Sequence, residues 1–504
     1  MEILSFVLYF IVVLGIGIVF FFKSRGGDEK DYFLGGRNMG PWVTAMSAQA
    51  SDMSAWLLMG LPGSILAFGL GQAWIGIGLA IGTALNWVFC AKRLRCFSKE
   101  ANDSITLPQY LSNRFVTSGK TLQIASAVIF LVFFTVYVAS SFVAGTTVFT
   151  TLFPNLAEGT AMLIFAAIII LYTFLGGYKA VCWTDFFQGL LMLVALLAVP
   201  IVAISMGNLD QSLVSKTLLD AEGNSCNFIA NVFNAPATEI ISGLGWGLGY
   251  FGMPHILVRF MGIQKPSMVK KSAIVAIVWV ILSIGATMVM AYIGRIFVTG
   301  EGIQLAEGLI ASGNQKLVFI ELARRLFPPF VAGLLLAAII AASMSTADSQ
   351  LLVASSSFTS DIYKPVIRKN ASNKETLWIG RIVVLVIAVI AYFIASSKGS
   401  GAQAIMNMVE NAWAGFGGSF GPVVLLSLFW KRLTYKGACA GVIVGAVVDV
   451  VWLFALTGKT GIYEIIPAFI CSTIVTVIVS LIDKKPSAEV EALFDNAVAE
   501  CNAE

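Results

Sequence analysis

The residue least expected in its surroundings is Asp52, which lies near the middle of an apolar segment from Trp42 to Ser64. An ionised carboxylate at bilayer depth costs at least about 2.5–3.5 kcal/mol, so it normally has a cation, a polar partner or a water-filled path beside it. The small residues around Asp52 would let the helix unwind, and carbonyls freed by unwinding are ligands for a small cation. The segment therefore predicts either a cation-coupled transport site or a buried carboxylate that caps a helix break or pairs with an arginine.

A second group of oxygen-bearing side chains lies in the apolar segment from 328 to 358. A serine or threonine in a membrane helix usually bonds to the carbonyl three or four residues before it, which is the simpler interpretation of any one of them. Their density favours a further role, because Ser345 and Thr346 beside Ala342 bring two hydroxyls and a carbonyl within one turn. Such hard oxygen donors suit a small cation. The polar residues of this segment are Ser343, Ser345, Thr346, Asp348 and Ser349.

The segment from Glu239 to Gly262 is rich in glycine and contains Pro254. Each interior glycine costs a helix about 1 kcal/mol and a proline about 3 kcal/mol, so we expect a break or close packing here. Its formal GxGxxG match does not indicate a dinucleotide site, because no strand precedes it and its flanks are a membrane span. Trp246 and Tyr250 lie one helical turn apart and would present one aromatic face to a cavity.

Other polar residues of the apolar segments have simpler structural interpretations. Tyr137 fits a core position as well as it fits a ligand cavity. The Gly176–Gly177 pair predicts a turn, after which Thr184 and Asp185 are placed to cap the next helix. His255, beside a proline, is expected to be structural.

The elements that must position these residues are membrane helices. Hydrophobic residues make up 58% of the 504, and charged residues only 12%, which is far more apolar than a soluble protein of this length. The basic residues lie between apolar runs, so the net charge of +4 predicts no nucleic-acid partner. Seven scattered cysteines and one histidine indicate neither a metal site nor a disulfide framework. The first 22 residues lack a basic leader and a cleavage site, and we expect a membrane helix there.

Runs of about 20 apolar residues predict thirteen transmembrane helices in an all-α polytopic protein. An odd number places the termini on opposite sides of the membrane. With the N-terminus outside, 25 of the 32 lysines and arginines fall on the inner side, which favours a cytoplasmic C-terminus. The predicted spans lie near 4–22, 42–66, 70–91, 122–152, 160–178, 185–206, 238–262, 272–297, 328–358, 377–396, 402–430, 436–457 and 463–482.

The two interrupted spans, 42–66 and 238–262, are about 195 residues apart with four helices between them. This spacing is typical of two inverted repeats of five helices, in which the broken first helix of each repeat lines a site at the midplane. The predicted organisation is a first helix and cytoplasmic loop (1–41), two repeats (42–206 and 238–430), two further helices (436–482) and a polar cytoplasmic tail (483–504).

Five motifs, spread from about Tyr32 to Pro486, resemble the sodium/solute symporter family, and most closely its bacterial members that transport proline. The motifs are GGRNMGPWVTAMSAQASDMSAWLLMGLPG, TLPQYLSNRF, GGYKAVCWTDFFQ, GWGLGYFGMPHILVRFM and AASMSTADSQLL. The resemblance implies a leucine-transporter-type fold of five plus five inverted repeats with three additional helices. It also implies sodium-coupled import of L-proline across the cell membrane by alternating access, with Na⁺ as coupling ion and no organic cofactor.

The resemblance also implies roles for individual residues. Sodium would bind the backbone carbonyls of Ala50, Met53 and Ala342 and the hydroxyls of Ser345 and Thr346. Asp52 matches the aspartate required for sodium coupling, and Ser54 and Arg37 match residues tied to transport. Arg37 alone is also consistent with a topology anchor. The proline pocket would comprise Tyr137, Trp246, Tyr250 and Pro254. The chain departs from the family pattern at Gln49 and Ala55, where glycine is expected.

Several alternatives remain open. The solute could be pantothenate, a sugar or another amino acid, and protons could replace sodium, with Asp52 as their carrier. A sensor kinase would need a long soluble C-terminal domain, whereas about 20 residues follow the last predicted helix. A hydrolase would need a nucleophile with a base, for which one histidine is thin support, so no enzyme is predicted. The expected partners are L-proline and the lipid bilayer, and the sequence indicates no oligomeric state.

Overall fold

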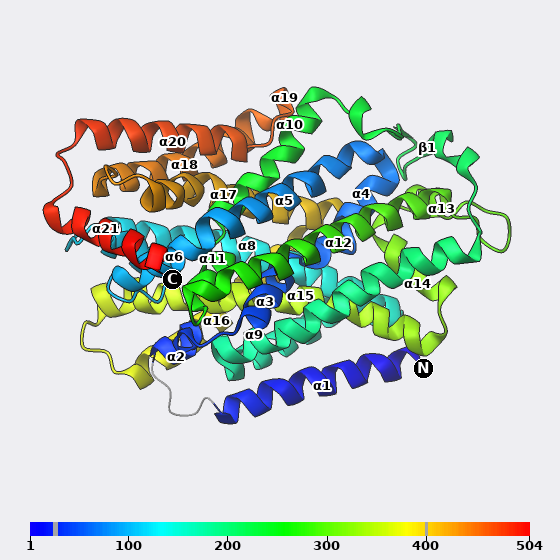
Figure 1. Cartoon of the computed structure of the whole chain (residues 1–504). Helices are drawn as coiled ribbons and strands as arrows, with labels where there is room; N and C mark the ends of the chain where they lie inside the picture. The colour runs from blue at the N-terminus through cyan, green and yellow to red at the C-terminus, as the bar shows by residue number, and fades with distance from the viewer. Residues whose placement is uncertain (24–28, 399–401, 504) are drawn as a thin grey trace.

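The structure is a computed structural model that describes residues 1–23, 29–398 and 402–503. Long helices lie side by side, and the two termini lie at opposite ends of the bundle (Figure 1). Residues 24–28 of the predicted first loop fall outside the described residues. The long helices are α1 (Glu2–Lys23), α8 (Thr121–Leu152), α9 (Glu158–Met206), α12 (Val269–Ile296), α15 (Pro329–Ser357), α16 (Asn373–Lys398), α17 (Ala402–Phe429), α18 (Tyr435–Ala455) and α20 (Ile465–Ile482).

Ten helical stretches among the described residues are long and apolar enough to cross a membrane. They correspond to ten of the thirteen predicted spans. The stretch from Leu70 to Glu100 combines η3 (Leu70–Gln72), α5 (Ala73–Leu85), the π-helix η4 (Asn86–Cys90) and α6 (Ala91–Glu100). The other three predicted spans are the two interrupted ones and 160–178, which is the first part of α9. The predicted all-helical membrane architecture is confirmed.

The first interrupted span consists of α3 (Pro41–Asp52), a 3-10 turn η2 (Ala55–Leu57) and α4 (Gly60–Phe68). Ser54 has an extended backbone, and its N–H donates to the carbonyl of Asp52 (2.9 Å). In a continuous helix this N–H would bond to the carbonyl of Ala50. The break therefore leaves the Ala50 carbonyl without its helical donor.

The second interrupted span consists of α10 (Ala237–Gly245), the 3-10 helix η7 (Trp246–Phe251) and α11 (Pro254–Gly262). Glycine is required where η7 crosses its neighbours, because a Cβ on Gly247 would lie 2.4 Å from the carbonyl oxygen of Gly78. The predicted break and close packing are both confirmed.

Helix α9 bends at Gly177, whose φ of 62° is the left-handed conformation that glycine allows. The predicted turn at this glycine pair is thus confirmed. The predicted cap is wrong, because Thr184 and Asp185 lie inside α9. The Thr184 hydroxyl donates to the carbonyls of Ala180 and Val181 (both 2.9 Å) on its own helix.

The helices differ in how much of their surface the protein covers. In α15 and α17, 83% of the most apolar stretch is buried, whereas in α16, α18 and α20 the share is 28%. Helices α15 and α17 therefore form the centre of the bundle, and the other three present their apolar side chains outward.

Short elements close the two ends of the bundle. The loop between α9 and α10 contains a hairpin of β1 (Leu218–Leu219) and β2 (Ser225–Cys226). The C-terminal segment, predicted only as a polar tail, forms α21 (Ala488–Ala503), which packs against α6 through Phe494 and Phe97 (centroids 5.2 Å apart). The remaining elements include α2 (Glu29–Leu34), α7 (Leu107–Asn113), α13 (Leu305–Ala311), α14 (Val318–Leu326), the π-helix η10 (Phe358–Ile367) and α19 (Thr457–Thr460).

Candidate functional site

The break after α3 packs against the middle of α15. The hydroxyl of Ser345 donates to the carbonyl of Ala50 across this contact (2.8 Å) and also to the carbonyl of Ala342 on its own helix (3.1 Å). All three residues are fully buried. Three of the five oxygens expected in a cation site therefore converge, and one of them is the carbonyl released by the break.

The hydroxyl of Thr346 is buried and has no hydrogen-bond partner among the described residues. A threonine hydroxyl inside a membrane helix normally bonds to a carbonyl of the preceding turn. Met53, the remaining expected ligand, is buried in the unwound turn with a ψ of 72°. An unsatisfied hydroxyl next in sequence to Ser345, which contacts the released Ala50 carbonyl, has the chemistry of a hard-cation site.

The carboxylate of Asp52 joins the two interrupted spans. Its Oδ2 accepts a hydrogen bond from the Tyr250 hydroxyl (2.5 Å), and both side chains are buried. The carbonyl of Tyr250 in turn accepts from the Asn86 side chain on η4 (3.0 Å). In the described part of the chain no lysine or arginine forms an ion pair with Asp52. Its hydrogen-bond partner is a tyrosine and not an arginine.

Ser54 and Arg37 have different surroundings. The Ser54 hydroxyl accepts from the N–H of Trp56 (3.4 Å) and so caps the 3-10 turn after the break. Arg37 precedes α3, and the helix from Pro41 to Asp52 alone is about 16 Å long at 1.5 Å per residue. The structure therefore does not bring Arg37 to the Asp52 site.

Arg37 instead forms hydrogen bonds with residues of other segments at its end of the bundle. It donates to the carboxylate of Asp103 (2.8 Å) and to the carbonyls of Met261 (2.5 Å) and Ser104 (2.8 Å). Burial lowers the pKa of the Arg37 guanidinium to about 10, so it remains charged at neutral pH. Because Met261 belongs to α11, Arg37 ties the start of the first interrupted span to the end of the second.

Trp246 and Tyr250 both contact Trp413 of α17. The Trp246 and Trp413 rings are stacked with centroids 6.4 Å apart, and the Tyr250 ring meets Trp413 edge-on at 5.1 Å. The Trp413 Nε1 donates to the Trp246 carbonyl (2.8 Å). The Tyr463 ring also packs against Trp246, with ring centroids 5.2 Å apart. The two aromatic side chains are thus parts of a larger aromatic cluster whose other members the sequence did not indicate.

Tyr137 and Pro254 lie next to the same region. The Tyr137 hydroxyl is buried near Ser54 without a well-formed hydrogen bond to any described residue. Its ring meets the His255 ring edge-on at 6.4 Å, and Pro254 is the first residue of α11. A buried hydroxyl whose hydrogen-bonding capacity is not used by the protein is a group to which a polar ligand could bind.

A second buried polar network was not predicted. Arg259 on α11 forms an ion pair with Asp185 on α9 (3.2 Å), and both side chains are fully buried. Arg259 also donates to the hydroxyls of Ser47 (3.1 Å) and Ser349 (2.5 Å), and Ser47 donates to Asp185 (2.7 Å). The network joins α3, α9, α11 and α15. Each of the two charged residues lies in an apolar span, which is the signal that could have suggested the pair.

The comparisons with known proteins agree on one family. The model of the sodium:solute symporter family matches residues 32–445. The chain is 43% identical over 500 residues to the sodium/proline symporter of Escherichia coli K12, covering 98% of this chain and 96% of that protein. It is 42% identical over 481 residues to the high-affinity proline transporter PutP of Bacillus subtilis, covering 95% and 98%.

The comparisons with solved structures concern the fold. A Na⁺-coupled sialic acid symporter in a substrate-bound outward-open state superposes with a TM-score of 0.75 at 19% identity, covering 96% of this chain and 98% of that one. MhsT in complex with L-phenylalanine superposes with a TM-score of 0.54 at 14% identity, covering 87% and 97%. The leucine-transporter-type fold class expected from the sequence is confirmed.

Proposed function

Because this chain belongs to the sodium:solute symporter family, we propose that it is a multi-pass plasma-membrane protein that imports L-proline together with sodium by alternating access. Its relatives are transporters and not enzymes. The observation that carries the proposal is the contact of Ser345 with the Ala50 and Ala342 carbonyls at the break beside Asp52. In this contact, hard oxygen atoms from two helices meet in the centre of the bundle, which supports a cation site there.

In this proposal sodium is a transported substrate and binds five oxygens near the α3 break. Two observations support the assignment. The hydroxyl of Thr346 has no partner among the described residues, and the Ala50 carbonyl has lost its helical donor and instead meets the Ser345 hydroxyl. Asp52 contributes charge rather than direct ligation. The proposed ligands are the carbonyls of Ala50, Met53 and Ala342 and the hydroxyls of Ser345 and Thr346.

The proposed proline pocket adjoins this site. Proline has an apolar ring and charged ends, so its pocket should combine flat apolar walls with a few directed polar groups. Trp246 and Tyr250 supply walls, the Tyr137 hydroxyl supplies a polar group, and Pro254 shapes the backbone. The hydrogen bond from Tyr250 to Asp52 connects the pocket to the sodium site.

Sodium flow supplies enough free energy for accumulation. One charge moving down about 100 mV provides roughly 2.3 kcal/mol, and a tenfold sodium gradient adds about 1.4 kcal/mol. One-to-one coupling then supports on the order of 500-fold accumulation of a zwitterion, from about 3.7 kcal/mol in total.

The membrane orientation and the repeats complete the proposal. The excess of basic residues at the end that carries α2, α6 and α21 supports a cytoplasmic position for that end, with the N-terminus outside. The two interrupted spans support two inverted repeats over 42–206 and 238–430. The first helix, two C-terminal helices and the tail from 483 to 504 would lie outside the repeats.

Uptake of radiolabelled proline into proteoliposomes, with sodium and proton gradients imposed separately, tests the function. We expect uptake to follow an inward sodium gradient and to be insensitive to a proton gradient alone. Competition by unlabelled pantothenate, a sugar or another amino acid as strong as that by proline would overturn the assigned solute. Uptake driven by protons alone would overturn the assigned ion.

Replacing Ser345 or Thr346 with alanine removes one of about five oxygen ligands. We expect sodium affinity, measured as the sodium concentration for half-maximal uptake, to fall by about 5- to 150-fold, since a lost buried partner costs roughly 1–3 kcal/mol. Ser343→Ala is the matched control, because among the described residues its hydroxyl bonds to the Ile339 carbonyl of its own helix (2.9 Å) and to no other group. Equal sodium affinity in all three variants would show that these hydroxyls only stabilise α15.

Replacing Trp246 with alanine removes one apolar wall of the proposed pocket. We expect proline affinity to fall by about 5- to 150-fold, because losing such a contact costs on the order of 1–3 kcal/mol. Sodium binding measured without proline should change much less. Tyr250→Ala should weaken proline binding as well, but its hydroxyl also bonds to Asp52, so Trp246 gives the cleaner test.

Trp452→Ala is the control for this prediction, because Trp452 lies on α18 and donates to the carbonyl of Ile462 (3.1 Å), outside the aromatic cluster. A loss of sodium affinity in Trp246→Ala as large as its loss of proline affinity would place Trp246 in general packing.

A further inference from the structure

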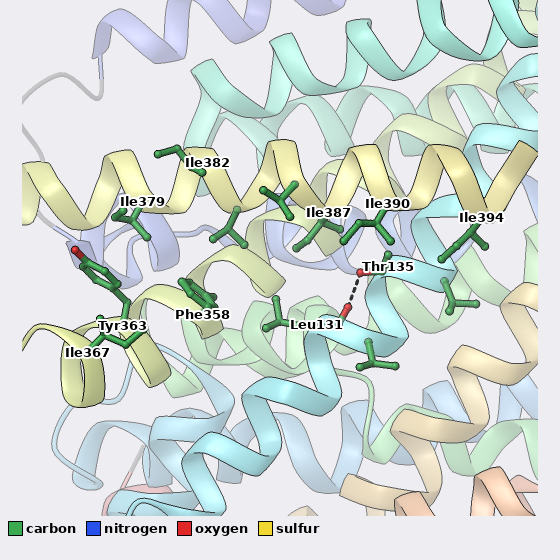
Figure 2. Close-up of a pocket in the computed structure, with 14 residues that line it drawn as sticks. Leu131, Thr135, Phe358, Tyr363, Ile367, Ile379, Ile382, Ile387, Ile390 and Ile394 are labelled. Atoms are coloured by element: carbon green, nitrogen blue, oxygen red, sulfur yellow. Dashed lines mark hydrogen bonds between the residues drawn. The ribbon is translucent and has the colours of Figure 1, made fainter.

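An apolar groove runs along the outward side of α16, between that helix, α8 and η10 (Figure 2). Its volume is about 720 Å³. Isoleucines of α16 follow the groove for most of its length, and Leu131 of α8 and Phe358 of η10 lie opposite them. The labelled isoleucines of α16 are Ile379, Ile382, Ile387, Ile390 and Ile394.

The groove opens on the side of α16 that the protein leaves uncovered and that would face the bilayer. Ile382 and Ile390 are 51% and 48% exposed, and only 28% of the most apolar stretch of α16 is buried by protein. The hydroxyl of Thr135 bonds to the Leu131 carbonyl (2.5 Å) and that of Tyr363 bonds to Glu375 (2.6 Å), so both are already satisfied. The lining therefore favours a hydrocarbon and offers no free hydroxyl to a polar solute.

The length of the groove favours a chain-like occupant. From Ile379 to Ile394 it follows about 22 Å of helix, at 1.5 Å per residue. One leaflet of a bilayer has a hydrocarbon thickness of about 15 Å. An extended acyl chain of one leaflet can therefore follow about two thirds of this groove, whereas a compact solute would leave most of it empty.

One end of the groove is strongly basic. The chain from 364 to 381 contains five basic residues and one acidic residue, Glu375. Glu375 pairs with Arg368 (3.1 Å), while Lys369 and Lys374 are exposed and form no ion pair within the described chain. Lys369 follows the lining residue Ile367 by two positions. Basic clusters of this kind attract anionic headgroups at the cytoplasmic leaflet.

We propose that this groove binds an anionic phospholipid, with one acyl chain along α16 and the phosphate at Arg368, Lys369 and Lys374. The proposal rests on the proposed orientation, which places the basic end in the cytoplasmic leaflet. Tyr363, beside this end, and Trp378, which is 49% exposed, are the aromatic residues expected at a membrane interface.

The lipid would contact the same continuous helix that carries the proposed sodium ligands. Helix η10 continues α15 without interruption, so the stretch from Pro329 to Ile367 forms one span. Phe358, Tyr363 and Ile367 of η10 line the groove, whereas Ser345 and Thr346 lie earlier on that span. A lipid that binds one position of this span better than another shifts the population toward that position.

Native mass spectrometry of the purified full chain, with phosphatidylglycerol or phosphatidylcholine added at equal concentration, tests the proposal. We expect retained phosphatidylglycerol and little phosphatidylcholine. Ile390→Trp should fill the groove and abolish retention. Val389→Trp is the matched control, because Val389 is 46% exposed on the same helix and does not line the groove.

A second pair of variants tests the headgroup without changing the groove. Lys369→Gln with Lys374→Gln should weaken phosphatidylglycerol binding by about 30-fold, since each basic residue near an anionic surface strengthens binding by about fivefold. Lys484→Gln with Lys485→Gln, two exposed lysines of the tail, should leave it unchanged. Equal retention of both lipids, or equal loss in the variant and control pairs, would overturn the proposal. Lipid retention is measured without transport, so this outcome is independent of the proposed solute.

Discussion

Asp52→Asn is expected to raise the sodium concentration needed for half-maximal uptake by on the order of 100-fold. A unit charge about 5 Å from a cation stabilises it by roughly 3 kcal/mol at an effective dielectric of 20. Asparagine keeps the size of the side chain and removes this charge. The side chain is 1% exposed, so water does not replace the lost interaction. Sodium-dependent uptake in proteoliposomes measures the effect.

Two further variants separate the charge of Asp52 from its hydrogen bond as the cause of the changed sodium dependence. Asp52→Glu keeps the charge and should raise the required sodium concentration far less than Asp52→Asn. Tyr250→Phe removes only the hydroxyl that donates to Asp52 and so tests the hydrogen bond separately from the charge. If Asp52→Asn and the parent protein show the same sodium dependence, Asp52 stabilises the helix break and does not contribute to sodium binding.

Arg259→Met is expected to lower the free energy of unfolding by about 3–5 kcal/mol. Removing one member of a buried ion pair leaves the other charge uncompensated, which costs about this much. Here Asp185 would lose the guanidinium, although the Ser47 hydroxyl would still donate to it. Thermal unfolding of purified protein in detergent measures the change.

The double variant Arg259→Met with Asp185→Leu should be less destabilised than Arg259→Met alone, because it leaves no unpaired charge. Lys216→Met removes an exposed pair with Glu307, whose side chains are 42% and 49% exposed, and should cost less than about 1 kcal/mol. A double variant at least as unstable as the single variant would mean that Arg259 stabilises the protein by packing alone.

Local composition was sufficient to predict both interrupted spans. Five of the six glycines in the second span lie between positions 243 and 252, and with Pro254 they are incompatible with a continuous helix. The 3-10 helix η7 forms among them. Asp52 marked the first break because an isolated carboxylate is costly in an apolar segment. Gly177 was identifiable in the same way, since only glycine readily adopts its backbone conformation.

Contacts between distant helices were not predictable in the same way. Asp185 and Arg259 are 74 positions apart, and nothing in either segment specifies that their side chains meet. The same holds for Trp413 and Tyr463, which belong to the aromatic cluster around Trp246. Asp185 was predicted to be a helix cap because capping depends on neighbouring residues, whereas its partners depend on how four helices pack.

The uninterrupted passage of α15 into η10 has a mechanical consequence. Asp361, in the first turn of η10, accepts hydrogen bonds from Thr106 (3.0 and 2.9 Å) and from Gln123 (2.8 Å). It lies about 22 Å beyond Thr346 at 1.5 Å per residue, so a rigid tilt of about 10° at the ion ligands would swing it through roughly 4 Å. A hydrogen bond cannot stretch that far. Such a tilt must therefore either break the hydrogen bonds of Asp361 or move the first residues of α7 and α8 together with η10. A small rotation at the centre of the membrane is thereby converted into a larger displacement at the end of the bundle.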